Sequence, residues 1–514
     1  MQDSLLAVLA SIPIVIFVLK RFRAPSHLDL PTVGYDGRLM SYFSSLRFLK
    51  EADVILRKGI TQYHGRLFKI PQMDQWVAVA SDHDFIENIR TAPEHILSMD
   101  AAIDDMIQAD YTLGPQVKLN TYHIPVIRNF SLTQNLNAIF PELVDEITHA
   151  IEDEFGPKTN KNEWAATPAA DTLTRIVCRV NHRVFVGLPL CRNTSYCNIN
   201  IENTTNIIVG AAILNLFPKF LKPVIGRLMS KVTGTQRRLL VHLKPLIEER
   251  KRLIEEFGPS YPDKPNDMLT WLMDAAPPGL ERTSESFVLR LLTVNFAALH
   301  STSMTLTHAM YYLAAQPESI RILRTEIESF LDKDVRNWTK DSLETCWKLD
   351  SFLKESQRLH ALNGLTMLRK AVAPYSFADG TTIPAGTTVA AATSAIHINP
   401  NVYDDPETFD PWRFSSMRER AVNSDDSVTR EADDMRFRFT GTGPGYLAFG
   451  GGRHVCPGRF FVSIVMKAFI ARLIMDYDLK MECEGVRPKD EWFGSNCVPN
   501  RHAKIMFRRR TATL

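Results

Sequence analysis

The stretch Phe449-Gly450-Gly451-Gly452-Arg453-His454-Val455-Cys456-Pro457-Gly458-Arg459 places one cysteine between a glycine-rich loop and an apolar run. The run, Phe460 to Leu473, has the spacing of a helix, so Cys456 is expected just ahead of a helix N-terminus. The N–H groups of the first turn and the positive end of the helix dipole then face the sulfur and favour its deprotonated form. The sequence therefore predicts a single protected thiolate.

A lone thiolate suits the iron of a haem, because the macrocycle supplies four further ligands and leaves the distal side open. The glycines would let the loop pass beneath a flat ring. Two simpler interpretations compete with this one. Cys456 can be a buried structural cysteine beside a turn. Gly441–Gly445 can be a nucleotide loop, but no strand precedes it and Pro444 lacks an N–H that such a loop would use.

The same stretch resembles the haem-binding loop of the cytochrome P-450 superfamily, F-x-x-G-x-R-x-C-x-G. The matching positions are Phe449, Gly452, Cys456 and Gly458. His454 stands where the family has a basic residue, and Arg453 is adjacent to it. The resemblance implies a haem b whose iron is axially ligated by Cys456.

Two haem propionates need cationic partners, because an unpaired buried carboxylate is costly. By resemblance, His454 or Arg453 meets one propionate, and Arg369 lies where the family commonly supplies another. Arg128 is a third candidate, in a segment similar to the family's W-x-x-x-R but without its tryptophan. A plain surface charge is the competing interpretation for each of them.

The segment from Ser284 to Ala315 is apolar on nearly every side, which predicts a long helix through the centre of the body. Three polar residues interrupt it at His300, Ser301 and Thr302. Hydroxyls inside a helix can bond the carbonyl four residues back and bend the helix, which is the simplest account of them. By resemblance, the family's A-G-x-[DE]-T pattern falls on 297–301, with histidine for the acid and serine for the threonine. It implies that these three residues deliver protons to the distal side of the haem, where dioxygen binds.

Glu355 and Arg358 are three residues apart and so share one face of a predicted helix. Arg413, in Phe409-Asp410-Pro411-Trp412-Arg413-Phe414, can add a second cation to the same carboxylate. The order resembles the E-x-x-R and P-x-R-F elements of the family. We expect a structural triad that pins the helix to the loop leading to Cys456.

Composition excludes several other classes of protein. The chain has 514 residues, a net charge of +2 and 45% hydrophobic residues, which indicates neither a nucleic-acid-binding surface nor disorder. Its seven cysteines are scattered without a C-x-x-C pair, as in proteins of a reducing compartment. No linker divides the chain, so we expect one large body over 39–514.

An apolar run from Ser4 to Leu19 is followed by Lys20, Arg21 and Arg23. We interpret 1–23 as a single transmembrane anchor with a basic stop and 24–38 as a proline-containing neck. Basic residues after the run place the body on the cytosolic side of the endoplasmic reticulum membrane by the positive-inside rule. A cleaved signal peptide is the alternative.

Short alternating stretches at 66–70 and 76–80 predict strands, and turn residues within 371–389 predict a hairpin. The pattern from 132 to 273 is mostly helical, and the polar stretch 424–431 indicates a surface loop. The expected fold class is therefore mainly α with a small β subdomain. By resemblance it is the cytochrome P-450 fold, with a long central helix over a buried haem.

The resemblance implies a monooxygenase that uses O2 and electrons from NADPH through a cytochrome P-450 reductase, in contact with membrane lipid. Apolar residues at 292–299, 362–367 and 493–499 are the expected contacts of a bulky lipophilic substrate. Tyr111–Gly114 and Ala298–Thr302 look like segments of fungal terpenoid oxidases, including kaurene-oxidase and indole-diterpene types. Steroid or polyketide oxidation, a haem-thiolate isomerase or dehydratase that needs no electron donor, and a haem-binding sensor or carrier are the alternatives.

Overall fold

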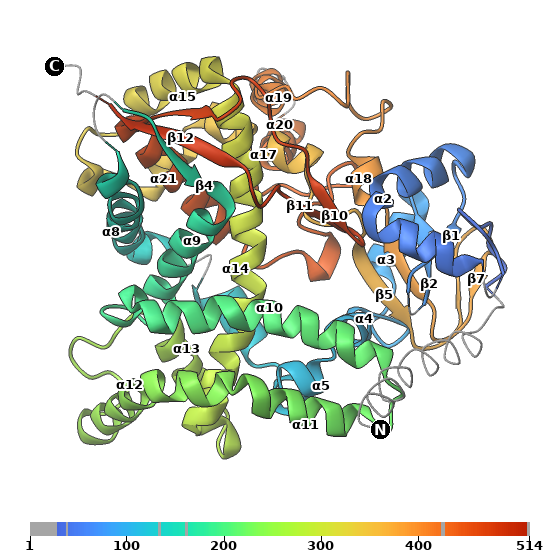
Figure 1. Ribbon diagram of the computed structural model, residues 1–514, viewed down its shortest axis with the longest axis horizontal. Helices are drawn as coiled ribbons and strands as arrows, with labels where there is room; N and C mark the ends of the chain where they lie inside the picture. Colours follow the sequence, from blue (N-terminus) through green and yellow to red (C-terminus); the bar gives the residue numbers. More distant parts are fainter. Residues whose placement is uncertain are drawn as a thin grey trace, which may run out of the picture.

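Helix α14, Ser284–Ala315, crosses the middle of the body and has the bounds that the sequence predicts (Figure 1). The Thr283 side chain caps its first turn by accepting a hydrogen bond from the Ser286 N–H at 3.2 Å. Pro317 opens the next helix, α15, Pro317–Phe330, at a position where its missing N–H is tolerated. Buried residues lie on all sides of α14, so other elements must cover it.

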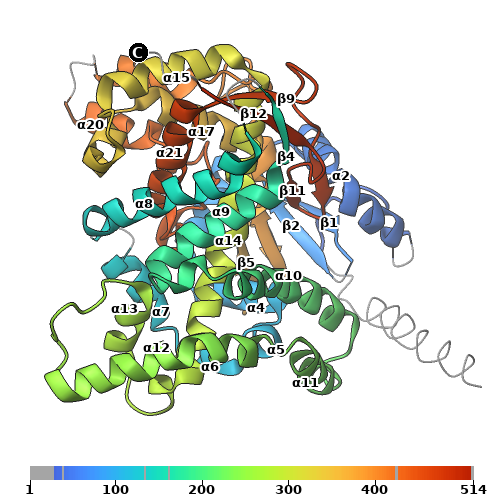
Figure 2. The same ribbon diagram turned by 60° about the vertical axis from the view of Figure 1, so that its left-hand side comes forward.

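The computed structural model describes residues 28–37, 40–73, 75–131, 135–159, 163–422 and 427–510. The longer helices around α14 are α8 Leu136–Phe155, α9 Ala169–Phe185, α10 Thr194–Leu216, α11 Lys222–Thr233, α12 Thr235–Phe257, α13 Met268–Ala275, α17 Trp347–Leu359 and α21 Arg459–Asp476. Helices α9, α10, α12 and α17 pack directly on α14, and Figure 2 shows α10 passing across it. The prediction of a mostly helical region from 132 to 273 is confirmed.

A mixed sheet lies to one side of α14. Its order is β1 Phe68–Pro71, β2 Trp76–Ala80, β8 Thr388–Ala391, β5 Thr366–Ala371 and β3 Leu97–Ser98. Phe68 pairs with Val79 in the antiparallel β1–β2 pair, and Val77 pairs with Thr388 where β2 runs parallel to β8. Both predicted strands are therefore present, and α2, Ser41–Gln62, packs against β1.

Smaller sheets complete the β structure. They are the hairpin of β10 Glu491–Phe493 and β11 Asn496–Val498, the sheet of β4 Ala165–Pro168, β12 Lys504–Arg509 and β9 Tyr477–Met481, and the pair β6 Tyr375–Ser376 with β7 Thr382–Ile383. The β6–β7 pair forms the predicted hairpin, and its flanks run into β5 and β8. Further helices are α3 His83–Thr91, α4 Met99–Ile107, α5 Ala109–Thr112, α6 Pro115–Leu119, α19 Arg413–Val422 and α20 Ser427–Phe437.

One local prediction was wrong. The polar stretch 424–431 was expected to be a loop, but α20 begins at Ser427 and runs to Phe437. A contact between helices accounts for the difference, because Asp434 of α20 accepts a hydrogen bond from Arg418 of α19.

The predicted anchor, 1–23, and the first part of the neck, 24–27, lie outside the described residues. Across the ranges that the structure covers, we find no helix with both the length and the apolar character needed to span a bilayer.

Candidate functional site

The loop around Cys456 is closed by its own backbone. The Cys456 N–H donates to the Phe449 carbonyl at 2.9 Å, which brings the two ends of the glycine run together. Gly452 has φ +66°, and a Cβ there would lie 2.7 Å from Cγ of Arg90. Only glycine meets both conditions, so the backbone can pass close to α3 at this point. Gly458 is the N-cap residue of α21, so Cys456 lies just ahead of a helix N-terminus, as the sequence predicts.

Burial raises the pKa of the Cys456 thiol above its ordinary value. The N–H groups of Gly458 and Arg459 and the charge of Arg459 act in the opposite direction, as expected at a helix N-terminus. In the protein without a bound metal, the effect of burial on the pKa of Cys456 therefore outweighs the predicted preference for the thiolate. Coordination to a metal cation is what deprotonates a thiol in such a position.

The predicted propionate partners have different surroundings. Arg369, on β5, is 2% exposed, and within the described part of the chain it donates only to the neighbouring Leu368 carbonyl, at 2.8 Å. His454 Nε2 is bonded to Glu94 at 2.8 Å, and Arg128 donates to the Arg453 carbonyl at 3.0 Å. Burial lowers the pKa of the Arg369 guanidinium; Glu94 opposes the shift and the charge of Arg453 adds to it. Three of the four predicted cations, Arg369, Arg453 and His454, therefore lie close together, and Arg128 lies at the edge of this group.

These residues fit a haem. Among the described residues, no carboxylate forms an ion pair with Arg369, and a buried unpaired cation is stable only if an anion completes it. Haem propionates are such anions. Cys456 provides a sulfur ligand in the loop that also carries Arg453 and His454, and the glycines at 450–452 add no side chain to this loop.

The polar residues of α14 do not share one role. His300 Nε2 lies 2.7 Å from the Thr204 hydroxyl of α10, so this side chain joins two helices. Ser301 donates to the Ala297 carbonyl at 2.8 Å, in the arrangement expected for a hydroxyl inside a helix. Ala297 and Ser301 are on the accessible side of α14, whereas Thr302 is buried. The Thr302 Oγ1 has no hydrogen-bond partner among the described residues, which is costly for a buried hydroxyl.

The predicted triad residues meet in the structure. Glu355 accepts two hydrogen bonds from Arg358, and Arg413 Nε lies 3.1 Å from Oε1 of the same carboxylate. All three side chains are buried. The carbonyls of His397 and Asp404 accept further N–H groups of the two guanidiniums, so α17 is tied to the chain ahead of α19.

Sequence reasoning missed two residues that connect this triad to the cysteine loop. His397 Nδ1 donates to the Arg358 carbonyl, and its Nε2 accepts from the Leu447 N–H, both at 2.9 Å. Burial lowers the pKa of His397 to about 3, so the ring is neutral. The ring of Tyr446 stacks on it, and the Tyr446 hydroxyl donates to Gln357 at 2.8 Å. The two partners of His397 are 39 and 50 residues away in sequence, so no local pattern marks it.

Two of the predicted substrate-contact segments are bonded to each other. The Gly364 N–H donates to the Ser495 carbonyl at 2.6 Å, and the Cys497 N–H donates to the Leu362 carbonyl at 2.9 Å. The β10–β11 hairpin therefore lies against the chain that leads from α17 to β5.

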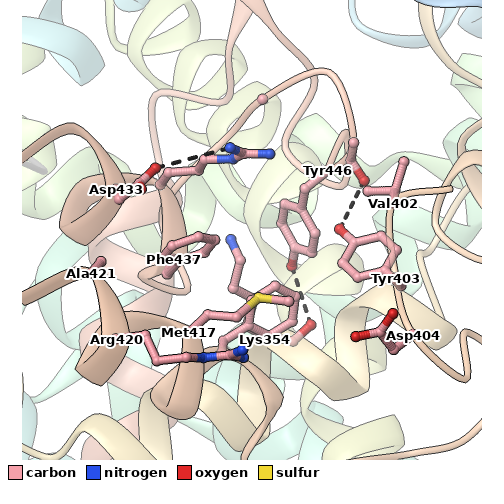
Figure 3. A pocket seen from close by; sticks show the side chains of 14 residues that line it. Lys354, Val402, Tyr403, Asp404, Met417, Arg420, Ala421, Asp433, Phe437 and Tyr446 are labelled. Atoms are coloured by element: carbon pink, nitrogen blue, oxygen red, sulfur yellow. Dashed lines mark hydrogen bonds and ion pairs between the residues drawn. The ribbon is translucent and has the colours of Figure 1, made fainter. Parts of the chain in front are cut away.

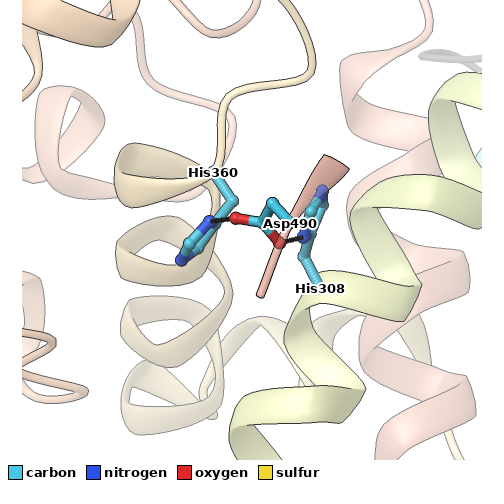
Figure 4. A group of neighbouring side chains, drawn as sticks. All are labelled: His308, His360 and Asp490. Carbon is cyan, nitrogen blue, oxygen red and sulfur yellow. Dashed lines mark hydrogen bonds and ion pairs between the residues drawn. The ribbon is translucent and has the colours of Figure 1, made fainter. Parts of the chain in front are cut away.

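A second cluster fixes this hairpin to α14. His360 Nδ1 lies 2.6 Å from one carboxylate oxygen of Asp490, and His308 Nδ1 lies 3.4 Å from the other (Figure 4). The spacing of the three side chains would suit a metal ion. Arg487 Nη2, however, lies 2.8 Å from Asp490 and 2.9 Å from His308, so a guanidinium already supplies the positive charge. The cluster is a network of hydrogen bonds and ion pairs.

The predicted segment Tyr111–Gly114 lines a pocket of about 810 Å³, together with α10, α11 and the first half of α14. Leu292, from a predicted contact segment, and Ile207, which the sequence did not indicate, contribute apolar surface. Asn203 adds a polar group that the sequence did not indicate: its Nδ2 is buried without a partner among the described residues.

Comparison with known proteins places this site in a family. The family model for Cytochrome P-450 matches residues 50–507. The chain is 39% identical over 482 residues to cytochrome P-450 monooxygenase 151 of Postia placenta, covering 94% of each chain. It is 30% identical over 513 residues to cytochrome P-450 monooxygenase CYP512U6 of Ganoderma lucidum, covering 99% of this chain and 97% of the relative.

A third relative is cytochrome P-450 monooxygenase paxP of Penicillium paxilli, 32% identical over 505 residues, or 97% of this chain and 93% of the relative. Among solved structures, the retinoic-acid-bound cyanobacterial CYP120A1 has the same fold, with a TM-score of 0.65 at 19% identity over 93% of this chain and 99% of the other. The chain thus belongs to the cytochrome P-450 family and is a monooxygenase that carries haem ligated by a cysteine thiolate.

Proposed function

We propose that this monooxygenase oxidises a bulky lipophilic substrate of the terpenoid class, with Cys456 as the axial ligand of its haem. Cys456 is assigned as the axial ligand because of its position. Five of the other cysteines are buried and Cys483 is exposed, whereas Cys456 alone lies at the start of α21 within the glycine loop. Electrons would come from an NADPH-dependent flavoprotein reductase, because the chain shows no flavin or nicotinamide motif of its own.

Bound haem would supply the activation of dioxygen that inserts oxygen into a C–H bond. The residues of the chain hold the group and control access to it. Arg369, with Arg453 and His454 nearby, would neutralise the propionates. Phe449 packs edge-on against Phe439, with ring centroids 5.4 Å apart, and so excludes water from the loop beside the sulfur.

Polar side chains of α14 would deliver the protons. The Ser301 hydroxyl donates its proton to the Ala297 carbonyl but keeps lone pairs to accept from a ligand, and the Thr302 hydroxyl has no partner among the residues that the structure describes. His300 is a further candidate, with the Thr204 hydroxyl as the next group on the path. Burial and the charge of Arg501 lower the pKa of His300, so it would pass a proton without holding a charge at neutral pH.

The terpenoid assignment is supported by the likeness of Tyr111–Gly114 and Ala298–Thr302 to fungal terpenoid oxidases and by the pocket that the first of these segments lines. We also propose the endoplasmic reticulum membrane as its location, on the basic residues that follow the apolar run Ser4 to Leu19. In this proposal 1–23 is the anchor, 24–38 the neck and 39–514 the catalytic domain.

The test is incubation of microsomes that contain the chain with reductase, NADPH and a panel of terpenoids, steroids and polyketides, followed by product mass. The proposal expects a terpenoid product that is heavier by one oxygen atom and that disappears without NADPH. A preferred steroid or polyketide would overturn the substrate class.

A haem-thiolate isomerase is the second candidate, and the substitutions at His300 and Ser301 favour it because they replace the acid and threonine of the family pattern. Such an enzyme would convert substrate in the absence of both reductase and NADPH, with no change in mass. The same incubation without reductase therefore separates the two reactions.

A further inference from the structure

A pocket of about 460 Å³ lies between α17, α19, α20 and the start of the cysteine loop, in a part of the molecule that the proposed function does not use. Four aromatic rings line it: Tyr403, Phe414, Phe437 and Tyr446. Met417 adds a polarisable sulfur to one wall. The volume is within the range of sites that bind small molecules.

Lys354, on α17, brings a buried cation to this pocket. It is 1% exposed, and Figure 3 shows its amine between the rings of Phe437 and Tyr446. The Nζ donates to the carbonyls of Arg438 and Gly441, at 2.8 and 3.0 Å, and lies 3.7 Å from the centre of the Tyr446 ring. An ammonium has three N–H groups, so among the described residues one has the face of the Tyr446 ring beside it but no oxygen or nitrogen acceptor. No carboxylate in the described part of the chain forms an ion pair with Lys354.

Arg436 brings a second positive charge to the same place. Its nearest carboxylate partner, Asp433, lies 4.0 Å away, at the limit of an ion pair. Burial lowers the pKa of Lys354 to about 7; Asp350 opposes the shift, and the charge of Arg436 adds to it. The lining as a whole holds three cations against two carboxylates. Two cations that repel each other in a half-closed pocket are both stabilised by an anion bound between them.

We propose that this pocket binds a small aromatic carboxylate, with its carboxylate on Lys354 and Arg436 and its ring against Phe437 and Tyr446. The four aromatic walls favour a planar ring over a flexible aliphatic chain. The unused N–H of the ammonium and the guanidinium provide charge-assisted hydrogen bonds to the carboxylate. A neutral ligand of the same shape would leave Lys354 without an anion and Arg436 with only its long contact to Asp433.

A ligand bound in this pocket would affect the haem site. Tyr446 stacks on His397, with ring centroids 5.0 Å apart, and His397 accepts from the N–H of Leu447, two residues before Phe449. A ligand that fixes the Tyr446 ring therefore restrains the approach to the cysteine loop. The pocket would act as an effector site that slows the loss of haem.

The experiment is calorimetric titration of 2-naphthoate into the haem-loaded full chain, with an azole bound to the haem iron at saturation so that the distal side is blocked. The neutral control ligand is 2-naphthalenemethanol. We expect naphthoate to bind with one site per chain and the alcohol to bind at least about tenfold more weakly, because it lacks the charge. Naphthoate should also slow haem transfer to an apo-globin acceptor.

Lys354→Met keeps the length of the side chain and removes its charge, so it should weaken naphthoate binding by at least about tenfold. Lys348→Met, on the exposed side of the same helix, is the matched control and should leave binding unchanged. Met417→Trp fills the pocket without touching the Lys354 hydrogen bonds. Naphthoate binding to this variant is the test if Lys354→Met does not retain haem. Undiminished binding in Met417→Trp or in haem-loaded Lys354→Met, equal affinity for the alcohol, or no binding by the unmodified chain would each overturn the proposal.

Discussion

Glu355 accepts two parallel hydrogen bonds from the guanidinium of Arg358, from Nε and from Nη2, each at 2.7 Å. Neither side chain is exposed at all. Arg413 adds a third bond to the same carboxylate, so one negative charge holds two buried cations. A planar guanidinium matches a carboxylate in this way, and a lysine would not. The pair fixes α17 to the chain that leads to the cysteine loop.

Glu355→Gln should leave both guanidiniums buried without a counter-charge. We expect the free energy of unfolding to fall by about 3–5 kcal/mol and most of the protein to be recovered without haem. The measurement is haem content together with denaturant unfolding. Glu318→Gln breaks the exposed pair with Arg321 on α15 and is the control, for which no measurable change is expected. A fully haem-loaded and equally stable Glu355→Gln protein would show that the triad is dispensable.

Arg369 should be needed for haem retention but not for the stability of the protein without haem. Arg369→Leu removes a buried cation that has no carboxylate partner among the described residues, so the apo protein should be no less stable. The rate of haem transfer to an apo-globin acceptor should rise by about tenfold, since one charge-assisted contact with a propionate is lost. A purely structural role for Arg369 predicts the reverse: lower stability and unchanged haem transfer.

The hydroxyls of α14 should control how well NADPH use is coupled to product. Replacing Ser301 and Thr302 together by alanine should raise NADPH oxidation per product by about tenfold or more, the usual size of a proton-transfer effect. Ser301→Ala alone should account for the larger part, because Ser301 is on the accessible side of the helix and Thr302 is buried. Product and NADPH are measured in the same incubation, and unchanged coupling in the double variant would remove both residues from the mechanism.

Acid should destabilise the fold through histidines that are buried in neutral form. Burial lowers the pKa of His397 to about 3 and that of His182 to about 4. Below about pH 6.5 the unfolded chain binds protons at these rings and the folded chain does not. The free energy of unfolding should therefore fall as the pH drops from about 6.5 towards 4, by up to about 1.4 kcal/mol per pH unit for each ring. Glu326, whose pKa burial raises, acts in the opposite direction. Urea unfolding at a series of pH values measures the slope, and a rise in stability on acidification contradicts this account.

The long central helix could be predicted to the residue, because an uninterrupted apolar pattern is bounded by a capping threonine and a proline. The loop around Cys456 and the two arginines on Glu355 could be predicted from local motifs. The contact of His300 with Thr204 could not, since it depends on how α10 packs on α14, 96 residues away in sequence. Lys354 is also indistinguishable from a surface lysine in the sequence, and only the arrangement of α19 and α20 buries it. Local patterns therefore predicted the elements and the ligand loop, while the polar network around them depends on tertiary packing.

The carbon-monoxide spectrum of the reduced protein tests the central claim most directly, because the position of the main absorbance band reports whether a thiolate is the axial ligand of the haem iron. We predict the strongly red-shifted band of thiolate ligation for the unmodified chain, and its loss in Cys456→Ser with haem still bound or absent. A red-shifted band that persists in Cys456→Ser, or its absence from the haem-loaded unmodified chain, would contradict the assignment of Cys456.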